Sequence, residues 1–152
     1  MQYFKKLVGD RIYLSPKGVS DAEIEKFTEW MNDFQVTDYT GRTAQITTLT
    51  GEKDYLENSA KDTKNRNFNI IELSENKIIG TLGLEHINWI ERSAVLGIFI
   101  GDKDFRSNGY GTEAIRLLLE YGFKYLNLHS IRLDLLAINE RAHKCYLKCG
   151  FK

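Results

Sequence analysis

A short glycine-containing turn is the segment of this sequence best suited to bind a charged ligand. Residues 106–112 read Arg-Ser-Asn-Gly-Tyr-Gly-Thr and join an apolar run to an amphipathic one. Glycine permits backbone angles and close approaches that a side chain would block, so the amides of this turn can point inward. The first N–H groups of a helix lack internal partners and lie at its positive end, which favours a pyrophosphate. A tight turn with small residues for packing is the alternative explanation of the same glycines.

A second group of residues with possible chemistry follows near the C-terminus. Asn139 and Tyr146 are seven residues apart, about two helical turns, so in a helix they project from one face. From spacing alone, a buried aromatic ring with a satisfied hydroxyl explains Tyr146 more simply than a catalytic role.

The two cysteines, Cys145 and Cys149, lie one helical turn apart. We expect both to be reduced and buried. No second Cys or His pair completes a ligand set, and His129 and His143 do not supply one, so the sequence predicts no metal site.

The turn is neither a P-loop nor a dinucleotide fingerprint, because the Gly-Lys-Ser/Thr ending and the distant acidic residue are absent. It resembles instead the cofactor turn of the GNAT family of N-acetyltransferases, Arg/Gln-x-x-Gly-x-Gly/Ala, in which Arg106, Gly109 and Gly111 match. The resemblance extends to GDRIYLSP, SDAE, IGTLGLEHIN, GYGTEA and NERAHKCYLKCGF, and so spans most of the chain. It is strongest to the branch that contains ribosomal-protein N-terminal acetyltransferases and spermidine N-acetyltransferases.

This resemblance implies that the protein moves an acetyl group directly from acetyl-CoA to a primary amine. Tyr146 would lie near the thioester sulfur and act as general acid toward the departing thiolate. A main-chain donor of the strand edge would face the developing oxyanion. The residues expected to hold acetyl-CoA are the strand edge Ile98, Phe99 and Ile100, the turn Arg106, Ser107, Asn108, Gly109, Tyr110, Gly111 and Thr112, and Asn139 on the pantetheine arm.

The general base is the part that the resemblance leaves open. Related enzymes often carry a glutamate at the start of the strand before the turn, where this chain has Ala94 and Val95. Glu85 is our candidate, with His86 next; strand alternation sends the two to opposite faces, so only one can enter a cleft. A solvent-facing charge, or a chain of waters that carries the proton away, remains the alternative.

The acceptor is a small molecule, a polyamine or a protein N-terminus. Four carboxylates could attract a polyamine or could form a solvated acidic rim: Asp33, Asp38, Glu85 and Glu91. A hypothesis from another functional class is a catalytically inactive CoA-binding module. It is suggested by the missing glutamate and by the short C-terminus. An RNA-binding or scaffolding domain is disfavoured because no basic and aromatic stripe is present.

Positioning these residues requires an α/β fold, with a mixed central sheet flanked by helices as in the GNAT fold. Ser20 and Glu23 form a capping-box pattern before a helix that includes Ile24, Phe27, Met31 and Phe34. Residues 35–50 lose any period and predict an exposed segment. The other expected elements are strands at 11–15 (ended by Pro16), 68–73, 77–87, 94–101 (covered on both faces) and 131–137, and helices at 52–61 (capped by Thr50), 112–126 and from Asn139 to Gly150.

Composition predicts one domain over residues 1–152. The chain is 42% hydrophobic and 28% charged, with a formal net charge of zero, which gives no field toward nucleic acid or an anionic membrane. No leader or membrane-spanning run is present, so we expect a cytoplasmic protein. Family members continue after Gly-Phe with a hairpin, whereas this sequence stops at Lys152; we expect a truncated chain or a sheet edge paired in a homodimer.

Overall fold

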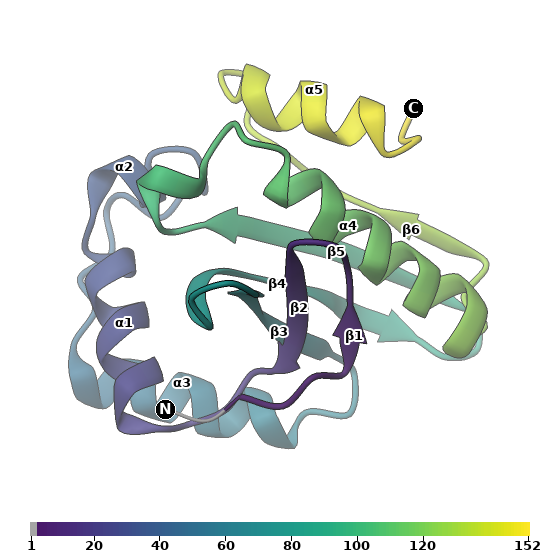
Figure 1. Cartoon of the computed structure of the whole chain (residues 1–152). Helices are drawn as coiled ribbons and strands as arrows, with labels where there is room; N and C mark the ends of the chain where they lie inside the picture. Colours follow the sequence, from purple (N-terminus) through teal and green to yellow (C-terminus); the bar gives the residue numbers. More distant parts are fainter. Residues whose placement is uncertain (1–2) are drawn as a thin grey trace.

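A six-stranded sheet forms the centre of the computed structural model, which describes residues 3–152 (Figure 1). The strands follow sequence order, and every neighbouring pair is antiparallel except β5 and β6, which are parallel. The strands are β1 (Leu7–Val8), β2 (Ile12–Pro16), β3 (Arg66–Glu72), β4 (Lys77–Asn88), β5 (Ser93–Ile100) and β6 (Ser130–Arg132). The helices are α1 (Asp21–Met31), α2 (Phe34–Thr37), α3 (Leu49–Lys61), the 3₁₀ turn η1 (Lys103–Phe105), α4 (Tyr110–Glu120), the π turn η2 (Tyr121–Tyr125) and α5 (Glu140–Lys148). The predicted fold class is therefore confirmed.

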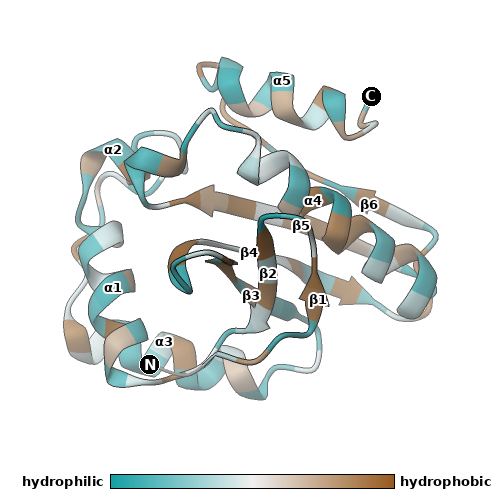
Figure 2. Cartoon of the chain, viewed as in Figure 1, coloured by the Kyte–Doolittle hydropathy of each residue, from teal (hydrophilic) through white to brown (hydrophobic). Residues whose placement is uncertain are grey.

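Helices cover the two faces of the sheet because strand residues alternate between them. In β2, Ile12 and Leu14 enter a core that α4 completes, while Tyr13 enters a second core under α1 and α3. Figure 1 shows α4 and α5 on one side of the sheet and α1 and α3 on the other. Apolar residues predominate in several of the central strands, and the helices present mixed surfaces (Figure 2).

The first helix is shorter than its apolar spacing predicts. The Ser20 hydroxyl accepts from the Glu23 amide, as expected of the cap. However, α1 ends at Met31, and Phe34 begins the separate helix α2, where it is 66% exposed. The carboxylate of Asp33 accepts from the Gln35 amide and so starts a new helix in place of continuing the old one.

Residues 35–50 are more ordered than the sequence indicates. They contain most of α2 and the first two residues of α3, so the prediction of a segment without elements was wrong. Thr48, not Thr50, caps α3, because its hydroxyl accepts from the Gly51 amide. Leu56 from this helix is buried in the core.

The last strands diverge from each other. β6 pairs only with Ser93, Ala94 and Val95 of β5, so the predicted strand at 131–137 stops at Arg132. Beyond Val95 the outer edge of β5 has no neighbouring strand. Leu96 is still buried, but Gly97 is exposed and the last three residues, 98–100, are only partly buried rather than covered on both faces. α4 begins two residues before the prediction, at Tyr110.

Within residues 3–152, no helix has the length and apolar character needed to cross a membrane.

Candidate active site

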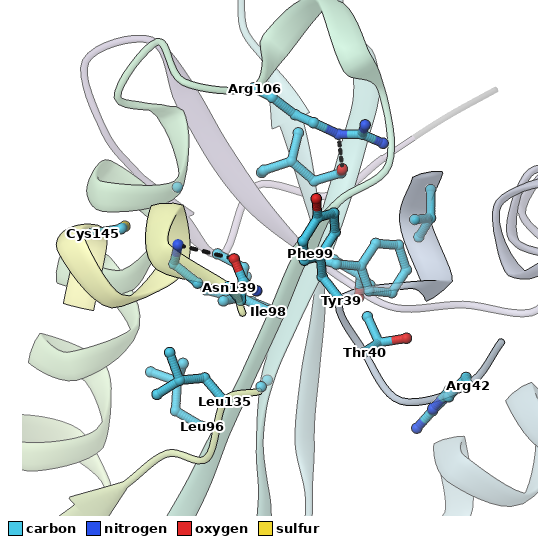
Figure 3. Close-up of a pocket in the computed structure, with 18 of the residues that line it drawn as sticks. Tyr39, Thr40, Arg42, Leu96, Ile98, Phe99, Arg106, Leu135, Asn139 and Cys145 are labelled. Atoms are coloured by element: carbon cyan, nitrogen blue, oxygen red, sulfur yellow. Dashed lines mark hydrogen bonds between the residues drawn. The ribbon is translucent and has the colours of Figure 1, made fainter. Parts of the chain in front are cut away.

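The divergence of β5 and β6 opens a cavity of about 1130 Å³. This volume is slightly above the range for small-ligand pockets, roughly 300–1,000 Å³. We call one part the turn side; it comprises Gly109, Gly111, Thr112, Asn139 and Tyr146. We call the other part the loop side; it comprises Lys17, Arg42, Glu52, Tyr55 and Glu85. Figure 3 shows Asn139 and Cys145 on one side of β5 and Tyr39 and Arg42 on the other.

The turn before α4 exposes main-chain donors to the turn side. Gly109 has a φ of +86° and Ser107 a φ of +61°, so two residues hold left-handed conformations. A Cβ on Gly111 would lie 3.8 Å from Cys145 Sγ, inside the cavity wall. No side chain caps α4, whereas Ser20, Asp33, Thr48 and Asn139 cap the other α-helices of residues 3–152. The first amides of α4 therefore remain available to an anion.

Arg106 holds the turn against the end of β5. Its Nε donates to the Ile100 carbonyl at 2.9 Å (Figure 3). Its Nη2 donates to the Gly101 carbonyl at 3.0 Å. Burial lowers the pKa of the guanidinium, which stays charged. Because these bonds use two of its donors on the backbone, Arg106 acts here as a brace for the turn.

Two predicted residues of the turn do not line the cavity. The Asn108 carbonyl accepts from Arg11 Nη1 at 2.9 Å. The ring of Tyr110 lies 4.2 Å from the Arg11 guanidinium and packs against Phe105. The side chain of Tyr110 therefore stabilises the outer surface of the turn, and Asn108 fixes its path through the backbone.

Strand alternation decides which main-chain groups of β5 face the open edge. The Gly101 amide donates to the Ile79 carbonyl of β4, while the Ile100 carbonyl points away from β4 toward Arg106. Since successive residues alternate in direction, the N–H of Ile98 also points to the open edge. The main chain of Phe99 points to β4, and its ring meets the edge of Trp30 at 5.9 Å. Of the three strand residues predicted, Ile98 and Ile100 present backbone to the cavity and Phe99 presents its side chain.

Asn139 and Tyr146 lie on the cavity face of α5, as their spacing predicts. The Asn139 side-chain oxygen accepts from the Ala142 amide, so it also caps the helix. Tyr146 is 8% exposed and packs against Phe151. Burial, followed by the charges of Cys145 and Cys149, raises the pKa of Tyr146 to about 12. Its hydroxyl makes no hydrogen bond within residues 3–152, which leaves it available to a ligand.

Both cysteines are free thiols, and they are half-buried rather than buried as expected. Cys145 Sγ lies 3.3 Å from Thr112 Oγ1, and so links α5 to the start of α4. Burial raises the pKa of Cys149 to about 11, which keeps this thiol protonated and unreactive. Residues 3–152 contain no cluster of three or more His, Cys, Asp or Glu that could hold a metal.

The structure separates the two candidate bases. Glu85 lines the cavity, and its charge acts on Lys17 and Tyr55 of the loop side. His86 has a φ of +50°, is exposed and does not line the cavity. The expectation that only one of them enters the cleft holds, and Glu85 is that residue.

Four residues of the loop side are absent from our sequence-based predictions: Lys17, Arg42, Glu52 and Tyr55. Lys17 directly follows the end of β2, and its amide continues the ladder to the Asn67 carbonyl. Its position as a charged residue directly after a buried strand was the one sequence feature that could have indicated a role for Lys17 in the site. Arg42 and Glu52 stand in segments without a diagnostic pattern.

Comparison with known proteins identifies the family. The acetyltransferase (GNAT) domain pattern matches residues 11–152. The chain belongs to the GNAT acetyltransferase family. It is an acetyl-CoA-dependent N-acetyltransferase, which confirms the enzyme class that the turn and its surrounding motifs implied.

Individual relatives agree with this assignment. The chain is 31% identical to the probable N-acetyltransferase YjcK of Bacillus subtilis, over 95% of this chain and 82% of the relative. It is 36% identical to spermidine N(1)-acetyltransferase of Vibrio cholerae, over 59% of this chain and 51% of the relative. The crystal structure of spermidine N-acetyltransferase from Vibrio cholerae in complex with CoA and spermine has the same fold. It superposes with a TM-score of 0.84 at 24% identity, covering 95% of this chain and 82% of that one.

Proposed function

We propose that this protein transfers the acetyl group of acetyl-CoA directly to a primary amine, within the cavity between β5 and α5. The observation that carries the proposal is the meeting of uncapped helix amides, an open strand edge and an unbonded phenol in one cavity. The turn side receives the coenzyme, and the loop side receives the amine.

The coenzyme is held at the start of α4. The amides of residues 109–112 receive its diphosphate, because they have no side-chain cap and lie at the positive end of the helix. The pantetheine arm then follows the open edge of β5 toward Asn139, pairing with the outward main-chain groups of Ile98 and Ile100 as an added strand would.

The reaction itself is acyl transfer without a covalent enzyme intermediate. The neutral amine attacks the thioester carbonyl, and the N–H at the open edge of β5 stabilises the oxyanion of the tetrahedral intermediate. The carbon–sulfur bond then breaks, and the CoA thiolate leaves. Tyr146 donates a hydrogen bond from its hydroxyl to that sulfur, since the hydroxyl has no competing partner within residues 3–152, and the thiolate then takes a proton from solvent.

The amine must lose a proton as it attacks. Glu85 accepts this proton, directly or through water, because it lines the loop side of the cavity. The products are the acetylated amine and the free CoA thiol. The spermidine N(1)-acetyltransferases among the relatives support an acceptor whose amine stands on a flexible aliphatic chain.

The test is thiol release from acetyl-CoA in the presence of a panel of amines. The proposal expects release that depends on the amine, with the acetylated amine detected by mass spectrometry. Binding of acetyl-CoA with no amine-dependent release across diamines, polyamines, amino acids and peptides would favour an inactive CoA-binding module.

A further inference from the structure

Two cations converge on the loop side of the cavity without an ion pair. Lys17 and Arg42 both line it, and the like charge of Arg42 acts on Lys17. The ion pairs of residues 3–152 involve other side chains, so neither cation has a carboxylate oxygen within 4 Å. Two like charges close together repel each other, and an anionic group that binds between them is favoured.

Aromatic rings hold Lys17 in this position. Its ammonium lies 4.7 Å from the ring centre of Phe27 and 5.5 Å from that of Tyr55. Such contacts fix the side chain but satisfy none of its three N–H donors. Burial lowers the pKa of Lys17, and the charges of Glu52 and Glu85 oppose this shift without forming an ion pair with the ammonium.

Carboxylates stand in the same wall: the charge of Glu52 acts on Lys17, and both cations act on Glu52, but no carboxylate of residues 3–152 lies within ion-pair distance of either cation. Glu52 is 7% exposed, and Glu85 lies further along, on β4 opposite Val95 of β5. Gly97 also lines the cavity, and the space next to it is open, because a Cβ there would meet no atom within 4 Å. The loop side therefore presents positive and negative groups that form no ion pair, around an open space.

We infer that the acceptor is an aliphatic amine that also carries a carboxylate, in other words an amino acid. Its carboxylate pairs with Lys17 and Arg42, and its amine points to Glu85 and the thioester. A polyamine satisfies Glu52 and Glu85 but places its own charges against the two cations. This inference rests on the proposed function, and it narrows the acceptor class.

Matched acceptors test it on the unmodified protein. Lysine and ornithine differ from cadaverine and putrescine only by a carboxylate. Thiol release is measured with each of the four, and with spermidine, at saturating acetyl-CoA. We expect kcat/KM for the two amino acids to exceed that of their diamines by about ten-fold or more, the size of one buried charge pair. Diamines or spermidine that match or exceed the amino acids would overturn the inference and leave the acetyltransferase proposal intact.

Variants locate the effect. Lys17→Met and Arg42→Gln should each lower kcat/KM for lysine about ten-fold while leaving that for cadaverine equal or higher. Lys53→Met is the matched control, because Lys53 is exposed on α3 and does not line the cavity. Equal losses for lysine and cadaverine in Lys17→Met would contradict a carboxylate contact. No release with any acceptor would instead refute the proposed function.

Discussion

Replacing Tyr146 with phenylalanine removes one oxygen from the centre of the proposed site. The ring is buried, packs against Phe151 and makes no hydrogen bond through its hydroxyl within residues 3–152. The Tyr146→Phe variant therefore keeps the packing and loses only the group that we place against the leaving sulfur.

The size of the effect follows from the pKa of the phenol. Burial raises the pKa of Tyr146 to about 12, whereas an ordinary alkyl thiol has a pKa of about 8.5. Full proton transfer from phenol to thiolate is thus uphill by roughly 5 kcal/mol at ~1.4 kcal/mol per pKa unit. Tyr146 consequently acts mainly as a hydrogen-bond donor to the departing sulfur. A hydrogen bond to a charged group contributes about 1.5–3 kcal/mol, so kcat should fall roughly 10- to 150-fold.

Steady-state thiol release measures this effect. In Tyr146→Phe we expect the fall in kcat with little change in the Kd for acetyl-CoA, because the turn before α4 is untouched. Tyr125→Phe is the matched control, since Tyr125 is 63% exposed and lies outside the cavity. An unchanged kcat in Tyr146→Phe, or a loss confined to coenzyme affinity, would refute the role at sulfur.

The remaining predictions concern stability, the turn and the base. Because the folded pKa of Tyr146 is about 12, the unfolded chain loses this proton near pH 10 and the folded one near pH 12. Its contribution to the free energy of unfolding is present below pH 10 and declines by roughly 2–3 kcal/mol up to pH 12. In denaturant titrations, the free energy of unfolding of Tyr146→Phe should therefore rise relative to that of the wild type over this interval. Parallel curves for the two proteins would contradict the raised pKa. Gly109→Val should weaken acetyl-CoA binding at least ~100-fold by calorimetry, since a φ of +86° excludes a β-branched residue. Gly150→Val is the control, because Gly150 has a φ of +96° but lies outside the cavity; the folded fraction of this variant should keep its affinity for acetyl-CoA. Glu85→Gln should lower kcat/KM roughly 100-fold and His86→Gln should not; equal activity of both variants would point to a water relay.

The sequence predicted the elements whose partners are strongly specified. The polar residues 74–76 between β3 and β4, and the β-rich run on each side of them, located the central hairpin to within two residues of its ends. The predicted length of the last strand was wrong because most of it has no neighbouring strand. Residues 133–137 continue the alternation of β6, but β5 has already turned away, so no ladder forms.

Helix boundaries failed for a different reason. Threonines at 47, 48 and 50 are all able to cap α3, and only the geometry of the Gly51 amide selects Thr48. Likewise, Phe34 keeps the helical spacing of α1, but the carboxylate of Asp33 caps a new helix, α2, which begins at Phe34.

The two sides of the cavity differed in predictability. The turn side is encoded locally, by glycines and by residues one or two helical turns apart, and so the residues that line it could be named as candidates from the sequence. The loop side brings together Lys17, Arg42 and Glu85, which are far apart in the chain. Their proximity depends on the sheet register and on the path of residues 38–47, which no local pattern records.

The location of the coenzyme diphosphate tests the account most directly. A crystal structure of the protein with CoA should place both phosphates within about 3 Å of the main-chain nitrogens of residues 109–112, with the pantetheine arm along the open edge of β5. A diphosphate bound elsewhere, or a cavity that stays free of CoA at saturating concentration, would contradict the account.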